Sequence, residues 1–231
     1  GFVVSFDWHP VMREIVHCCR VLKIPTILVP HESVFIDEER YYVARSGANM
    51  PATDHVLAWG QMQRRIFLER GYRPDRLLVT GSPKFDIFHR YQPTLDRDAY
   101  ASIFALDPSL PIVLFAGQPL DSQANSQDYA LDRQSQAIED LLDVARELGV
   151  QVIIRQPPAK RTIIDQKTRL KIETSVDFAI DGPVKFLVSP EEALYHAAAV
   201  LSVNSTKLFE AGRLGLPAIP KPSFKLCQNW P

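Results

Sequence analysis

The stretch that decides the fold is residues 199–212, near the end of the chain, and it reads AVLSVNSTKLFEAG. Its apolar start predicts a buried strand, the Asn204-Ser205-Thr206 turn offers hydroxyl groups that cap a helix, and the residues from Lys207 onward predict that helix. The helix then begins at the carboxyl end of the strand. Open α/β sheets bind ligands at this position, and the backbone N–H groups of a helix start favour a phosphate.

Glu210 extends this motif because it lies four residues after Thr206 and shares a helix face with it. Hydroxyl groups for a phosphate and a carboxylate for a ribose diol together indicate a nucleotide pocket. An ordinary capped helix of an α/β protein is the alternative interpretation.

Composition limits the classes of protein that the chain can represent. Its 231 residues, 46% of them hydrophobic, are enough for one or two domains. A net charge of -1 argues against a protein that holds nucleic acid by bulk electrostatics. Cys18, Cys19 and Cys227 make neither a disulfide framework nor a zinc spacing, so we expect a cytoplasmic protein. No apolar run reaches the roughly 18 to 20 residues that a membrane-spanning helix needs.

Residues 1–90 predict an incomplete Rossmann-like domain. Strand, helix and strand follow one another over residues 1–29, and the same order returns over residues 55–80, so we expect parallel strands. The chain starts within an apparent strand and stops after CQNWP without a closing element. We therefore expect a fragment that is trimmed at both ends.

Residues 91–110 are polar and contain two prolines, which is typical of a linker between domains. Residues 111–231 predict a second Rossmann-like domain, with a strand at 111–117, a polar loop at 118–132, a helix at 134–148 and a strand at 150–155. Candidate edge strands lie at 172–173 and 184–188. The expected fold class is α/β, with two doubly wound domains that face a cleft, where ligands bind.

Three polar clusters follow strands of the second domain, and the carboxyl ends of parallel strands meet at one edge of a sheet. They lie at 118–123, at 155–161 and at 204–206 with Glu210. Arg155 and Lys160 would oppose a phosphate. The alternative for Arg155 is a structural ion pair with an acidic residue.

Asp7 and His31 are the candidate catalytic residues, because each follows a strand of the first domain and a general base needs a carboxylate or an imidazole. Asp7 as a helix N-terminal acid and His31 as a histidine held by a backbone carbonyl are the alternatives. Neither a metal-binding spacing nor a glycine-rich phosphate loop occurs, which argues against a nucleotide hydrolase or a dehydrogenase. We expect no cofactor apart from a nucleotide substrate.

Three stretches resemble GT-B type enzymes of bacterial surface-polysaccharide synthesis. They are residues 56–86, VLAWGQMQRRIFLERGYRPDRLLVTGSPKFD; residues 115–127, FAGQPLDSQANSQ; and residues 202–219, SVNSTKLFEAGRLGLPAI. Within that group the chain is most similar to the capsule-synthesis Kdo transferases. The residues of this chain that match the capsule motifs include Gln118, Asp121, Ser122, Gln123, Asn204, Ser205, Thr206 and Glu210.

This resemblance implies a metal-independent glycosyltransferase that moves a sugar from a nucleotide donor, with CMP-Kdo as the first choice, to a glycan or glycolipid acceptor. It implies that Arg155, Ser205, Thr206 and Glu210 hold the nucleotide. Peripheral association with the inner face of the cytoplasmic membrane, through segments outside this chain, is left open. One departure stands out, because Gln156 replaces the histidine of the family's Lys/Arg-x-His-Pro motif. Either Gln156 binds the donor phosphate instead, or the activity is altered or lost.

Two further functions stay open. A related GT-B enzyme, either a UDP-N-acetylglucosamine 2-epimerase or a polyol-phosphate transferase, would fit the same fold. An epimerase needs carboxylates around the sugar, and the acidic residues that cluster are Glu32, Asp37, Glu38 and Glu39. A non-catalytic domain that keeps only nucleotide-sugar binding is the other possibility.

Overall fold

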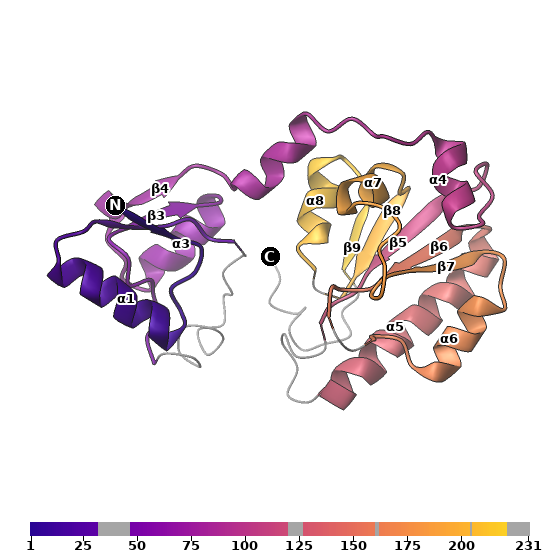
Figure 1. The fold of residues 1–231 in the computed structure, drawn as a ribbon, viewed down its shortest axis with the longest axis horizontal. Coiled ribbons are helices and arrows are strands. Elements are labelled where there is room, and N and C mark those ends of the chain that lie inside the picture. Colours follow the sequence, from indigo (N-terminus) through magenta and orange to yellow (C-terminus); the bar gives the residue numbers. More distant parts are fainter. Residues whose placement is uncertain (32–46, 120–126, 160–161, 204, 221–231) are drawn as a thin grey trace. The chain divides into compact units, whose positions relative to one another are not determined.

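The structure, a computed structural model, describes residues 1–31, 47–119, 127–159, 162–203 and 205–220. The chain divides into two compact units, the first formed by residues 1–87 and the second beginning at Phe88. Both units are drawn in Figure 1. Each is described by itself below.

The first unit is a four-stranded parallel sheet in the order β1-β2-β3-β4. Its elements are β1 (Phe2–Val4), α1 (Pro10–Val21), β2 (Thr26–Leu28), β3 (His55–Ala58), α3 (Gln61–Glu69), the 3₁₀ turn η2 (Pro74–Arg76) and β4 (Leu77–Val79). The longer 3₁₀ stretch η3 (Pro83–His89) follows. Strands and helices alternate here as the sequence predicts.

The side chains of these strands alternate between a buried and an open face. Val4, Leu28, Val56 and Leu77 belong to one core cluster together with Phe67 of α3. Successive side chains of a strand point to opposite faces, so β1 and β4 direct other residues away from this core. Val3 and Leu78 are accordingly 61% and 54% exposed.

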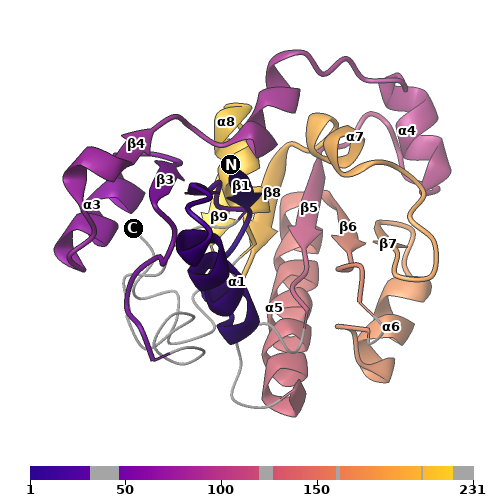
Figure 2. The same cartoon turned by 60° about the vertical axis from the view of Figure 1, so that its left-hand side comes forward.

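The second unit is a five-stranded parallel sheet in the order β7-β6-β5-β8-β9. Its elements are α4 (Arg97–Ile103), β5 (Ile112–Ala116), α5 (Gln127–Leu148), β6 (Gln151–Arg155), α6 (Gln166–Glu173), β7 (Phe178–Asp181), α7 (Pro190–Tyr195), β8 (Ala199–Ser202), α8 (Lys207–Arg213) and β9 (Ala218–Pro220). Figure 2 shows the five strands of this sheet in sequence from β9 to β7. The chain first builds outward from β5 to β7 and then returns to place β8 on the other side of β5, which is the doubly wound order. The predicted α/β class with parallel sheets is confirmed.

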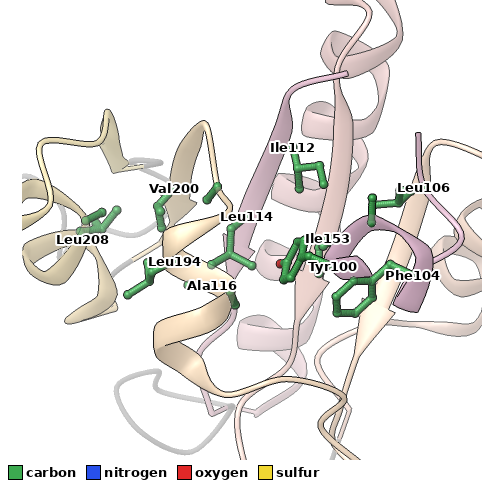
Figure 3. Packing of buried hydrophobic residues seen from close by; sticks show 14 residues of the cluster. Tyr100, Phe104, Leu106, Ile112, Leu114, Ala116, Ile153, Leu194, Val200 and Leu208 are labelled. Carbon is green, nitrogen blue, oxygen red and sulfur yellow. The ribbon is translucent and has the colours of Figure 1, made fainter. Parts of the chain in front are cut away.

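Helices cover both faces of this second sheet. Phe115, Val152 and Ile154 pack with Ile138 and Leu142 of α5 on one face. On the other face, Leu114 and Ile153 pack with Tyr100 of α4, Leu194 of α7 and Leu208 of α8. Figure 3 shows this second cluster, in which Tyr100 lies beside Ile153. Each central strand therefore contributes alternate side chains to two cores, as a strand buried on both faces must.

Two predicted edge strands are wrong. Residues 172–173 end the helix α6, and residues 184–188 are not in a strand; the edge strand is β7. Asp165 caps α6 by accepting a hydrogen bond from Thr168 N at 2.7 Å. The helix was missed because only Thr168 and Ile172 are buried, which leaves almost no apolar periodicity. The loop predicted at 118–132 is also shorter, since α5 already begins at Gln127.

The segment predicted as a linker, 91–110, packs within the second unit, where it contains α4. Buried Glu192 of α7 accepts hydrogen bonds from the hydroxyl of Tyr91, from Thr94 N at 3.1 Å and from Leu95 N at 3.0 Å. Arg97 donates to the carbonyl oxygens of His196 and Leu110, both at 2.6 Å. Polar residues that suggested an exposed linker are thus used for internal hydrogen bonds.

We predict that Glu192→Gln lowers the free energy of unfolding by about 2 kcal/mol, because hydrogen bonds to a charged acceptor are replaced by weaker ones. Burial raises the pKa of Glu192, but the hydrogen bonds from Tyr91, Thr94 and Leu95 outweigh burial and lower it from 4.5 to about 2. A carboxylate with a lowered pKa stabilises the fold above its unfolded pKa, and this stabilisation is lost as the pH falls towards the folded pKa. Wild-type stability should therefore decrease more steeply than that of the variant between about pH 4.5 and 2 in urea titrations. Parallel pH profiles of the two proteins would contradict this role.

Candidate functional site

The candidate site lies at the carboxyl edge of the second sheet, between β5 and β8. These two strands are neighbours, but the chain leaves β5 towards β6 and leaves β8 towards β9. The connections therefore diverge at this edge, and open α/β sheets bind ligands at such a switch point. Gly117 and Gln118 follow β5, and Val203, Ser205 and Thr206 follow β8.

Ser202 joins the carboxyl ends of the two strands. Its side chain is fully buried, and its hydroxyl donates to the carbonyl oxygen of Ala116 at the end of β5, at 2.5 Å. The hydroxyl oxygen of Ser202 in turn accepts a hydrogen bond from Ser205 N at 3.1 Å. One hydroxyl thus links the end of β5, the end of β8 and the turn into α8. Sequence reasoning placed this residue in a strand and missed its role, because the partner is a backbone carbonyl 86 residues away.

The start of α8 is held by local hydrogen bonds. Ser205 Oγ accepts from Lys207 N at 3.2 Å, and Thr206 is the N-cap residue, without a capping hydrogen bond from its own side chain. Glu210 is 1% exposed and forms an ion pair with Lys207. Thr206 and Glu210 were predicted to share a helix face. Lys207 lies beside that face, and its ammonium group pairs with the Glu210 carboxylate.

The loop that follows β5 is anchored by a residue that sequence reasoning also missed. Buried Gln134 of α5 accepts from Gln118 N at 2.8 Å and donates to the Gln118 carbonyl at 2.9 Å, so one side-chain amide pairs with one backbone unit. The signal was present, since Gln134 lies four residues before Ile138 and hence on the apolar face of the helix.

Gly117 brings the backbone of β5 close to its neighbours. A Cβ atom at this position would lie 2.2 Å from Ile163 Cδ1 and 3.2 Å from the Arg155 carbonyl oxygen. A side chain at this position would require Ile163 to move.

Arg155 has the structural role that the sequence left as its alternative. Its guanidinium group forms an ion pair with fully buried Asp181, donates to the Val188 carbonyl at 3.1 Å and lies 4.7 Å from the centre of the Phe186 ring. Burial lowers the pKa of Arg155 and raises that of Asp181, and the attraction between the two charges opposes both shifts. The expectation that Arg155 opposes a phosphate is corrected, because its charge is already compensated inside the fold.

Gln156 is likewise used inside the fold and is 2% exposed. Its Nε2 donates to the Gly182 carbonyl at 3.1 Å, and its Oε1 accepts from Thr162 Oγ1 at 2.7 Å and from Ile163 N at 3.2 Å. Both ends of the amide have partners. The expectation that Gln156 replaces a phosphate-binding histidine is therefore corrected; the residue shapes the loop between β6 and α6.

Asp7, predicted as a base, is fully buried in the first unit. Its Oδ2 accepts from Ala52 N at 2.6 Å and from Thr53 N at 3.1 Å. The carboxylate fixes the segment that leads into β3, which corrects the catalytic assignment.

His31 keeps an exposed imidazole at the end of β2. Its Nδ1 lies 2.9 Å from the Ser5 carbonyl oxygen, and its ring packs on Phe6 with 5.7 Å between the ring centres. Because a carbonyl can only accept, this contact assigns the proton to Nδ1 and leaves the lone pair on Nε2. The backbone carbonyl contact matches the structural alternative, and the geometry is also compatible with a base.

Several predicted site residues lie outside the described part of the chain, so their positions stay open. They are Asp121, Ser122, Gln123, Lys160 and Asn204, together with the acidic residues Glu32, Asp37, Glu38 and Glu39. Among the residues that the structure describes, no group of three or more His, Cys, Asp or Glu side chains could hold a metal ion. Within the same ranges, no helix combines the length and the apolar character that crossing a bilayer requires.

No protein-family model matches the chain, and no curated protein sequence matches it either. Solved structures do match. S. aureus MnaA with UDP is similar over 93% of this chain and 55% of its own, with a TM-score of 0.67 and 13% identity. The UDP-GlcNAc 2-epimerase from Neisseria meningitidis, bound to UDP-GlcNAc, is similar over 93% of this chain and 57% of its own, with a TM-score of 0.65 and 14% identity.

The wall teichoic acid polymerase TagF with CDPG is also similar, over 84% of this chain and 47% of its own, with a TM-score of 0.50 and 14% identity. The chain thus spans about half the length of the solved structures that it matches. At these identities the likeness establishes the fold alone, an α/β fold with parallel sheets. The narrower resemblance to the capsule-synthesis family stays a prediction.

We predict that Asp7→Ala lowers the free energy of unfolding of the first unit by about 2–3 kcal/mol, because two buried backbone N–H groups lose their acceptor. Chemical denaturation followed by circular dichroism measures this. Glu14→Ala removes an exposed carboxylate from α1 and should change stability by less than about 0.5 kcal/mol. Equal stability of the two variants would show that Asp7 is not a structural residue.

Proposed function

We propose that the second unit binds the nucleotide part of a nucleotide sugar at the carboxyl edge of β5 and β8, and that the chain forms part of a GT-B type enzyme. The observation that carries this proposal is the Ser202 bridge. Its hydroxyl bonds both to the end of β5 and to the turn before α8, so it fixes the carboxyl ends of the two central strands to each other. Backbone N–H groups and hydroxyls at such a sheet edge suit a phosphate ester.

Conversion of a UDP-sugar is the reaction class that we propose first. The structures similar to this chain include enzymes described as UDP-GlcNAc 2-epimerases, one of them bound to UDP-GlcNAc. Transfer of a polyol phosphate is supported in the same way by TagF with CDPG. These likenesses support a nucleotide-sugar substrate and favour uridine or cytidine diphosphate as the recognised group.

Transfer of Kdo from CMP-Kdo to a glycan or glycolipid is the second candidate. It is favoured by the residues of 202–219 that match the capsule-synthesis motif. Arg155, Gln156 and Asp7 no longer support it, because each is used inside the fold. A domain that binds the donor without catalysis is compatible with the same geometry.

The test is a thermal-shift panel of UDP, CDP, CMP and GDP. A ligand that binds only the folded state stabilises it by RT ln(1 + [L]/Kd), so a 100-fold excess over Kd contributes about 2.7 kcal/mol. We expect UDP or CDP to raise the melting temperature most. Preference for CMP would support Kdo transfer instead, and no response to any of the four would contradict nucleotide binding.

Two variants locate the nucleotide site. Thr206→Val keeps the shape of the side chain at the start of α8 but removes its hydroxyl, and we expect nucleotide affinity to fall about tenfold, as the loss of one good hydrogen bond does. Thr174→Val is the matched control, because Thr174 lies between α6 and the amino end of β7, away from the proposed site, and its hydroxyl donates to the Leu170 carbonyl at 2.8 Å. Isothermal titration calorimetry with the best nucleotide of the panel measures both; equal loss in the two variants would place the site elsewhere.

A further inference from the structure

The open edge of the second sheet offers an interaction surface that is separate from the nucleotide site. Among the strands that the structure describes, β7 pairs only with β6. Val152 N donates to the Asp177 carbonyl and Gln156 N to the Asp181 carbonyl, both at 2.9 Å. Alternate residues of a parallel strand bond to opposite sides, so Phe178 and Ile180 direct their backbone N–H and C=O groups away from β6. Figure 2 shows β7 as the last strand of the row.

A groove of about 610 Å³ runs along this edge. Phe104 at the end of α4 lines one side of it and Ile172 of α6 lines the other. Apolar side chains at its rim face solvent, because Val176 is 80% exposed and Val184 is 99% exposed. An open strand edge between apolar walls is the arrangement that pairs with a further strand.

The charges along the groove are self-complementary. Glu173 lines it before β7, next to Arg169, with which it forms an exposed ion pair at 3.3 Å, and Lys185 lines it after β7. If the added strand is the same segment of a second copy, an antiparallel arrangement brings Glu173 of each copy to the end where Lys185 of the other lies. A parallel arrangement would place like charges together. The groove therefore favours β7 of a second copy of this chain, which runs antiparallel to the first and is related to it by two-fold symmetry.

We propose that β7 pairs with β7 of a second copy of this chain about a two-fold axis at Ala179. In this register Phe178 of one copy lies opposite Ile180 of the other. Both residues direct their backbone groups outward, so each such pair exchanges two hydrogen bonds. Ala179 lies opposite Ala179 of the second copy at the non-hydrogen-bonded position, where Cα atoms approach to about 4.5 Å. The two sheets become one, and the apolar rim is covered.

The first test uses charge reversal. Wild-type protein should show concentration-dependent dimerisation in sedimentation velocity at low salt. Glu173→Lys and Lys185→Glu should each weaken it by on the order of tenfold, since each creates two like-charge contacts per dimer. The double variant should restore it. Glu173 also pairs with Arg169 at 3.3 Å, but both side chains are largely exposed, so folding should be unaffected.

A matched pair of lysine substitutions tests the position of the interface. Val176→Lys at the groove should prevent dimerisation, whereas Leu148→Lys, which replaces a 69% exposed residue at the end of α5, should not. Hydrogen exchange gives an independent reading, because the amides of Phe178 and Ile180 should become protected only as the dimer forms. A monomer at all concentrations, or a dimer that the charge reversals and Val176→Lys leave unchanged, would overturn the proposal.

Discussion

The hydroxyl of Ser202 joins the carboxyl ends of the two central strands of the second unit, where we propose the nucleotide site. In a doubly wound sheet the chain leaves the two central strands in opposite directions, so nothing in the strand ladder fixes their carboxyl ends beyond the last pair. Ser202 supplies that link with one hydrogen bond to β5 and one to the turn before α8. Because the residue is fully buried, loss of its hydroxyl would leave a backbone carbonyl and an amide without their partner.

Three of the polar residues that the sequence suggested for catalysis or donor binding have partners inside the fold. Arg155 balances the charge of buried Asp181, Gln156 fixes the loop after β6, and Asp7 accepts two backbone N–H groups. These residues occupy carboxyl ends of strands, where both ligands and loops need hydrogen bonds. A polar residue at such a position is therefore weak evidence for a site until its partners are known.

The similarity to solved structures and the strand order of the chain support the same fold. Two parallel α/β units are shared with UDP-GlcNAc 2-epimerases and with TagF, at identities of 14%. In this chain Ser202 fixes the carboxyl ends of β5 and β8, which is where open α/β sheets bind ligands. The sugar and the reaction depend on further side chains, which is why they belong to the proposal rather than to the fold.

The sequence by itself determined the fold class and the parallel strands, since apolar periodicity and the turn residues before helices are local signals. Only the tertiary structure decided which polar residues bond to partners inside the fold. Gln134, Ser202 and Glu192 act through partners 16 to 101 residues away, and α6 formed although its sequence shows little periodicity. Hydrogen bonds and ion pairs between distant residues leave no spacing pattern in the chain, so their pairing becomes visible only once the sheet has brought them together.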